Sequence, residues 1–74
     1  MGVPKRLTEM QKRFCQYLVF GGPEGPVNKA EAAELAGYSV KRARQEGAEL
    51  TNPRQSPLVV KYKDELEQER DLKF

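Results

Sequence analysis

The 74-residue chain contains no histidine, no tryptophan and a single cysteine. Without histidine, a Ser-His-Asp or Cys-His nucleophile and a Cys/His zinc site are excluded, and one cysteine cannot form an internal disulfide. The longest apolar run covers residues 17–20, far short of the roughly 20 residues that span a membrane. The sequence also has no secretory signal, which together with the lone thiol predicts a reducing, cytoplasmic setting. What remains is a small binding domain, for which we expect no catalytic residue, no metal and no cofactor.

The net charge is only +2, but it is unevenly distributed. Residues 1–54 hold nine Lys/Arg against six Glu, whereas residues 55–74 hold four against five acids. The basic residues form two clusters, Lys5, Arg6, Lys12 and Arg13 in the first and Lys41, Arg42 and Arg44 in the second. Clustered positive charge on a nearly neutral chain indicates a patch for an anionic partner, although ordinary solvated surface gives the same pattern.

Hydrophobic spacing predicts an all-α fold, a small bundle of about four helices. We expect these helices over residues 9–20, 29–36, 40–51 and 57–72. Thr8 and Gln11 form a capping box before the first helix. Asn28 and Gly37 are the expected caps of the second, and Ser39 is the expected N-cap of the third. The last helix is expected to start at a proline in its first position.

The predicted core follows from the apolar face of each helix. The inward residues are Met10, Phe14, Tyr17 and Leu18; Ala32, Ala33, Leu35 and Ala36; Val40, Ala43, Gly47 and Leu50; and Leu58, Val59, Tyr62, Leu66 and Leu72. Cys15 lies at the edge of its face and is expected to be a small core residue. Arg42 is expected to pair with Glu46, four residues on.

The second and third predicted helices form a helix-turn-helix pattern. Ala33 supplies a small contact residue, Gly37 tolerates a positive φ in the turn, and Tyr38 can plug the crossing. The second helix of such a pair offers its outer face to DNA. The candidate DNA-binding residues there are Ser39, Lys41, Arg42, Arg44 and Gln45, and Lys5 and Arg6 of the leader would add phosphate or minor-groove contacts. By itself this spacing is also typical of ordinary helix corners.

The sequence resembles the N-terminal region of bacteriophage terminase small subunits. The resemblance is carried over residues 7–53 by Leu7-Thr8 with Gln11, Arg13-Phe14, Tyr17-Leu18, the Ala-rich stretch 28–36, Ala36-Gly37-Tyr38-Ser39, Ala43-Arg44-Gln45, Gly47, Leu50 and Asn52-Pro53. It implies a non-catalytic DNA-recognition subunit of the genome-packaging motor in an infected or prophage-bearing bacterium. Such subunits bind double-stranded viral DNA, assemble as homo-oligomeric rings, and assist the large ATPase/nuclease subunit.

On this interpretation the chain has three parts. Residues 1–7 are a flexible basic leader and residues 8–56 the helix-turn-helix domain. Residues 57–74 form an amphipathic helix that packs on the domain or leads to an oligomerisation region. Because full members of the family are longer, contacts with the large subunit would come from regions outside these residues.

Two other functions also fit the sequence. The amphipathic last helix would suit a protein-interaction module with no DNA role. The same pattern would also suit a stand-alone helix-turn-helix transcription regulator. The acidic run over residues 64–71 alternates with basic residues around a helix and is expected to be solvated surface, not a metal site.

Overall fold

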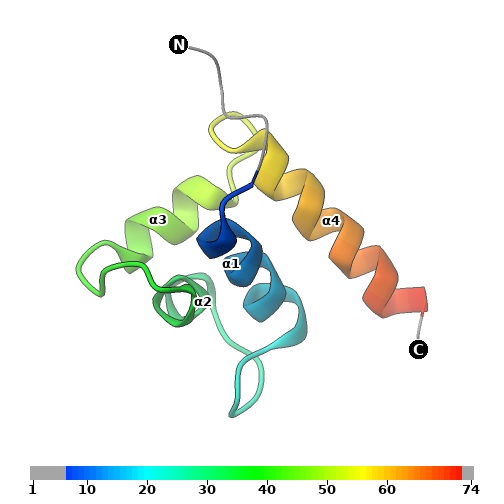
Figure 1. The fold of residues 1–74 in the computed structure, drawn as a ribbon, viewed down its shortest axis with the longest axis horizontal. Helices are drawn as coiled ribbons and strands as arrows, with labels where there is room; N and C mark the ends of the chain where they lie inside the picture. The colour runs from blue at the N-terminus through cyan, green and yellow to red at the C-terminus, as the bar shows by residue number, and fades with distance from the viewer. Residues whose placement is uncertain (1–6, 73–74) are drawn as a thin grey trace.

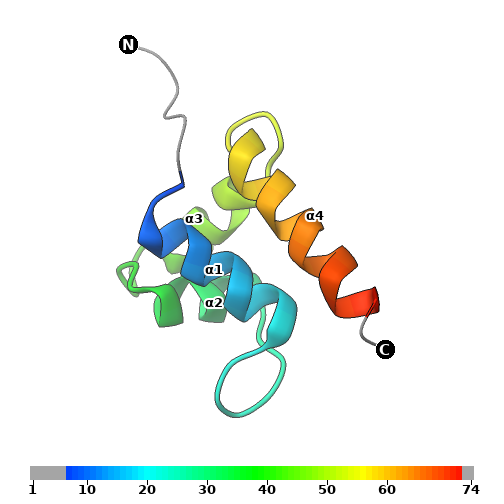
Figure 2. The same ribbon diagram turned by 45° about the vertical axis from the view of Figure 1, so that its right-hand side comes forward.

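A computed structural model describes residues 7–72, which form four helices: α1 (Glu9–Phe20), α2 (Lys29–Ala36), α3 (Ala43–Leu50) and α4 (Pro57–Leu72). In Figures 1 and 2, α1 lies between α4 on one side and the α2–α3 pair on the other. The loop between α1 and α2 projects at the end of the molecule opposite to the α3–α4 connection. The predicted all-α bundle is therefore confirmed.

The caps of α1 and α2 are those that the sequence predicts. The Thr8 hydroxyl accepts a hydrogen bond from the Gln11 amide at 3.1 Å, and the Gln11 side chain accepts one from the Thr8 amide at 2.9 Å. The Asn28 side chain accepts from the Glu31 amide at 2.9 Å. At the end of α2, Gly37 adopts φ +112°, a left-handed conformation that costs little only for glycine.

The predicted start of α3 is wrong by three residues. Ser39 does not cap the helix, because its carbonyl accepts from the Arg42 amide at 3.0 Å and closes a turn over residues 39–42. The helix begins at Ala43, and Arg42 stands at its N-cap with no side-chain hydrogen bond. The physical reason lies one residue earlier, where Tyr38 packs against the core and anchors the chain directly after α2. The turn then carries the chain back to the next inward position, Ala43.

The start of α4 is as predicted, at Pro57. The preceding turn is held by Asn52, whose side-chain oxygen accepts from the Arg54 amide at 2.9 Å and whose carbonyl accepts from the Ser56 amide at 2.8 Å. Proline suits the first helical position because its missing N–H would have no partner there.

All four helices contribute residues to the core. The buried hydrophobic residues are Phe14, Cys15, Val19, Ala32, Ala33, Ala36, Ala43, Leu50, Val59 and Leu66. Three predicted core residues are instead exposed: Leu35 to 41%, Val40 to 75% and Leu72 to 87%. Leu35 lies on the flank of the small-residue face of α2, and Val40 belongs to the turn before α3.

Leu72 is exposed because Arg70 takes the inward position one turn after Leu66. The Arg70 guanidinium donates to the carbonyl of Val19 at 3.1 Å, which satisfies a carbonyl in the last turn of α1. Cys15 lies along the same seam, where its thiol donates to the carbonyl of Val59 at 3.5 Å. Polar contacts at both ends thus fix α4 on α1.

Within residues 7–72, no helix combines the length and hydropathy needed to cross a lipid bilayer.

Candidate nucleic-acid interface

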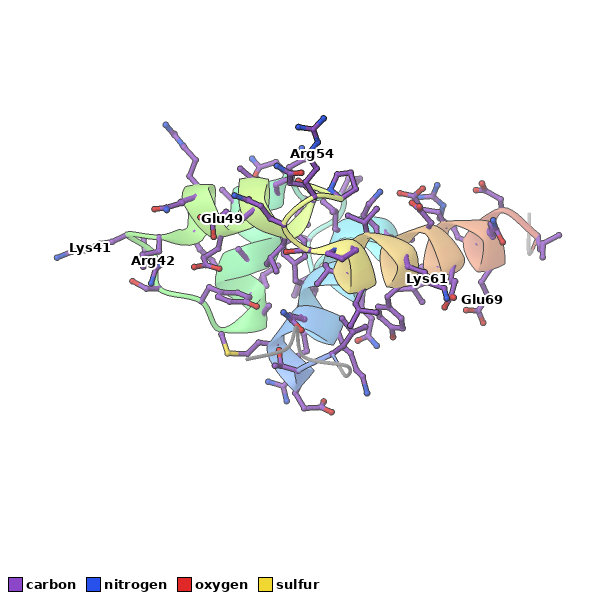
Figure 3. The ribbon with its side chains drawn as sticks, turned by 90° about the horizontal axis from the view of Figure 1, so that it is seen from above. Lys41, Arg42, Glu49, Arg54, Lys61 and Glu69 are labelled. Atoms are coloured by element: carbon purple, nitrogen blue, oxygen red, sulfur yellow. The ribbon has the colours of Figure 1, made fainter. Side chains whose placement is uncertain are left out.

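The candidate residues around α3 are all exposed. They are Ser39, Lys41, Arg42, Arg44 and Gln45. In Figure 3, Lys41 and Arg42 lie at one end of the molecule, in the turn before α3, and the Lys41 side chain extends away from the body. Lys5 and Arg6 lie outside the described residues, so their predicted contribution stays a prediction.

The two sides of α3 differ sharply in character. Ala43, Gly47 and Leu50 are buried on the inner side. Arg44 and Ala48 are exposed on the outer side, which follows from a rotation of about 100° per residue. Because Ala48 is small, a bulky partner can approach the helix axis closely at this position. The outer side therefore presents a cation next to a low point in the surface.

The polar groups on one flank of α3 already have partners. Arg42 pairs with Glu46 at 3.1 Å, as predicted, and the Gln45 amide donates to the Glu49 carboxylate at 3.1 Å. Lys41 and Arg44 have no ion pair with any residue in the described part of the chain. An incoming anion would therefore meet Lys41 and Arg44 without having to displace a carboxylate.

Lys29 belongs to the same surface, although the sequence did not single it out. The helices α2 and α3 cross at Gly47, where a Cβ atom would lie 3.0 Å from the carbonyl carbon and oxygen of Lys29. This close approach places Lys29 beside Arg44 at a shallow hollow, lined by Leu18, Asn28, Lys29, Ala30, Arg44 and Ala48. The signal in the sequence is Gly47 itself, because a glycine inside a helix costs stability and therefore indicates a packing or functional reason.

Arg54 is a second cation that the sequence did not single out. It is exposed, and in Figure 3 it stands out from the connection between α3 and α4. The Asn52 side chain accepts a hydrogen bond from the Arg54 amide, which holds the backbone of Arg54 in place while its side chain is solvated. Cations thus stand at both ends of α3, at Lys41 and at Arg54.

A surface of opposite charge lies at the loop between α1 and α2. A shallow depression there is lined by Pro23, Glu24, Val27, Glu31, Glu34 and Leu35. Glu24, Glu31 and Glu34 have no ion pair within residues 7–72. Three unpaired carboxylates repel a polyanion, so this face is unsuited to nucleic acid and confines the candidate interface to the α3 side.

Three titratable groups of the described chain have shifted pKa values: Cys15 in the interior, Lys63 on α4, and Tyr38 between α2 and α3, where burial and then the Glu46 carboxylate raise the pKa. Burial raises the pKa of the Cys15 thiol to about 11, so this thiol is neutral and unreactive at physiological pH. A hydrogen bond to Glu67 raises the pKa of Lys63. Among the described residues, no three Asp, Glu or Cys side chains come together to hold a metal ion.

The fold is thus an all-α bundle whose α2–turn–α3 pair carries exposed, unpaired cations on its outer side. The family model for the terminase small subunit matches residues 7–74 of the chain. The chain therefore belongs to the terminase small subunit family, which acts in phage DNA packaging. The match continues beyond the 7–53 stretch that carries the resemblance and takes in α4.

Comparison with curated proteins and with solved structures found no match.

Proposed function

We propose that this chain is a DNA-recognition domain of a terminase small subunit and binds double-stranded viral DNA through the outer side of α3. The observation that carries the proposal is the pair of unpaired, exposed cations, Lys41 and Arg44, on the helix-turn-helix of a chain in this family. With eight residues, α3 is about 12 Å long, which suits the width of the major groove.

Within this proposal the exposed groups have separate tasks. Lys41 and Arg44 contact phosphates or guanine edges, and Ser39 donates to a phosphate at the start of the turn. Arg42 is partly neutralised by Glu46, and the Gln45 amide already donates to Glu49, so both would contribute less unless DNA displaces these partners. Lys29 and Arg54 would contact flanking phosphates, and Lys5 and Arg6 of the leader would add further ones.

The chain itself would supply recognition and no catalysis. Homo-oligomerisation and assistance to the large ATPase/nuclease subunit would be functions of the assembled small subunit, in the cytoplasm of the infected or prophage-bearing host. The division into leader, helix-turn-helix domain and last helix remains part of the same proposal. The contact of α4 with α1 supports the view that this helix packs on the domain.

The test is the affinity for a duplex of about 30 base pairs, measured by fluorescence anisotropy between about 50 and 200 mM salt. The unmodified chain should bind with an affinity that falls steeply as salt rises. The double variant Lys41→Ala/Arg44→Ala should bind about tenfold or more weakly, and its log–log salt slope should fall by up to about 1.8, since each lost phosphate contact removes about 0.9.

A matched control separates the site from general charge. Lys61→Ala removes one exposed lysine from α4, and Lys41→Ala removes one from the turn; Figure 3 shows these lysines on different parts of the molecule. Only Lys41→Ala should weaken binding clearly. Equal losses for both variants would mean that the face is wrongly assigned. Absence of binding at low salt, with oligomers detected by light scattering, would favour the protein-interaction alternative.

A further inference from the structure

The exposed side chain of Val40 is out of keeping with its surroundings. It is 75% exposed, yet its neighbours Ser39, Lys41 and Arg42, which are also exposed, are polar or charged. The other large exposed hydrophobic residues of the described chain lie elsewhere, on α1, α2 and the end of α4. Val40 is thus an isolated apolar group inside the candidate DNA-binding surface.

The backbone that carries Val40 is held in place on both sides. Before it, Gly37 closes α2 in the left-handed conformation and Tyr38 packs against the core. After it, the Arg42 amide donates to the Ser39 carbonyl at 3.0 Å, across the turn that contains Val40. The branched side chain is itself stiff at χ1. A contact made by Val40 would therefore cost little conformational entropy in either its backbone or its side chain.

Base-pair edges offer one apolar group in the major groove, the C5-methyl group of thymine. Phosphates and the other base edges offer hydrogen-bonding or charged groups, which a valine cannot satisfy. We propose that Val40 contacts a thymine methyl group and makes the domain favour a T·A pair at that position. This inference rests on the proposed DNA binding, and it assigns a source of sequence preference to a residue with no charge.

The experiment begins with selection from a randomised duplex library at low salt, using the chain immobilised at high density. Each thymine of the selected sequence is then replaced singly by uracil, which removes only the methyl group. Binding of the unmodified chain should weaken about fourfold at one or two positions, the effect of one buried methyl group. Val40→Ala, which removes both γ-methyl groups, should bind the thymine and the uracil duplex equally. Val40→Thr, which keeps one γ-methyl group, should show an intermediate ratio between the two affinities.

Leu72→Ala is the matched control, because it truncates another mostly exposed apolar side chain, on α4, and should leave the thymine-to-uracil ratio unchanged. Both residues are largely solvated, so neither truncation threatens folding, which circular dichroism verifies. Measurable binding without a selected sequence overturns the inference and leaves DNA binding standing. The inference is also overturned, with DNA binding left standing, if replacing thymine by uracil weakens binding of Val40→Ala as much as that of the unmodified chain. Absence of any duplex binding by the unmodified chain overturns both proposals.

Discussion

The Cys15 side chain links the α1–α4 seam to a measurable pH dependence. Its thiol is fully buried, donates to the Val59 carbonyl and has a pKa raised by burial to about 11 from 9.0. A thiolate at this position would be desolvated, so the folded state favours the protonated form. Between about pH 9 and 11 the folded chain therefore binds more protons than the unfolded chain, and stability falls as pH rises.

We expect the free energy of unfolding to drop by about 2 kcal/mol between pH 9 and 11 from this group alone. Denaturant unfolding at a series of pH values measures it. Burial also raises the pKa of Tyr38, and the hydrogen bond to Glu67 raises that of Lys63, so both contribute in the same direction at higher pH. Cys15→Ala should remove the fall in the free energy of unfolding that begins near pH 9 and retain the fall at higher pH that Tyr38 and Lys63 cause. An unchanged pH profile in this variant would contradict the assignment.

Among the helices, those with strong local signals were predicted with correct boundaries. The caps at Thr8, Asn28 and Gly37 and the proline at the start of α4 act through neighbours within a few residues, which is why the sequence alone reveals them. The start of α3 depends instead on how the chain returns to the core after Tyr38. The sequence predicts that Tyr38 packs inward, but no local pattern encodes the turn over residues 39–42 that follows it.

The candidate interface shows the same division. Exposure of Arg44 follows from the helical period of α3 alone, whereas Lys41 is exposed because it lies in the turn before that helix. The partnership of Gln45 with Glu49 was not anticipated, because it depends on the rotamers of two side chains. Lys29 joins the surface only through the crossing of α2 over Gly47, which is a tertiary contact. The sequence thus predicts which side of a helix faces outward, but not which other elements border it.

The crossing of α2 and α3 gives a direct test of this packing. Gly47→Ala would place a Cβ atom 3.0 Å from the backbone carbonyl of Lys29, and neither helix backbone can yield easily. Overpacking costs about 1–3 kcal/mol, and the higher helix propensity of alanine offsets up to about 1 kcal/mol. We expect a net loss of about 1 kcal/mol in denaturant unfolding.

The adjacent position provides the control for Gly47→Ala. Ala48→Gly exchanges the same two residue types on the exposed side of the same helix, so it measures the propensity difference without the close contact. The free-energy cost of the close contact is the stability lost in Gly47→Ala plus the stability lost in Ala48→Gly, because the alanine introduced at position 47 gains the propensity that the glycine at position 48 loses. If Gly47→Ala stabilised the chain by the amount that Ala48→Gly destabilises it, the close approach of α2 would be refuted.

For the whole molecule, the net charge of +2 combines a basic α3 side with an acidic depression at the α1–α2 loop. A few phosphate contacts from one such copy give weak binding, in the range of non-specific dissociation constants, about 10⁻⁴ to 10⁻⁶ M. Specific recognition of viral DNA would then depend on several copies acting on one duplex, since linked domains bind the second site at a high effective concentration.

Fusion of a dimeric coiled coil after Phe74 should therefore tighten binding to a long duplex by about 10²–10⁴-fold relative to the single chain. The longest dimension of the described structure is 41 Å, so a duplex of about 12 base pairs accommodates one copy and one of about 36 accommodates two or more. Anisotropy titrations on both duplexes should show the gain only on the longer one. The same fusion carrying Lys41→Ala/Arg44→Ala should show little gain on either. Equal tightening on both duplexes would indicate that the fused segment, not the pairing of two α3 surfaces on one DNA, causes the effect.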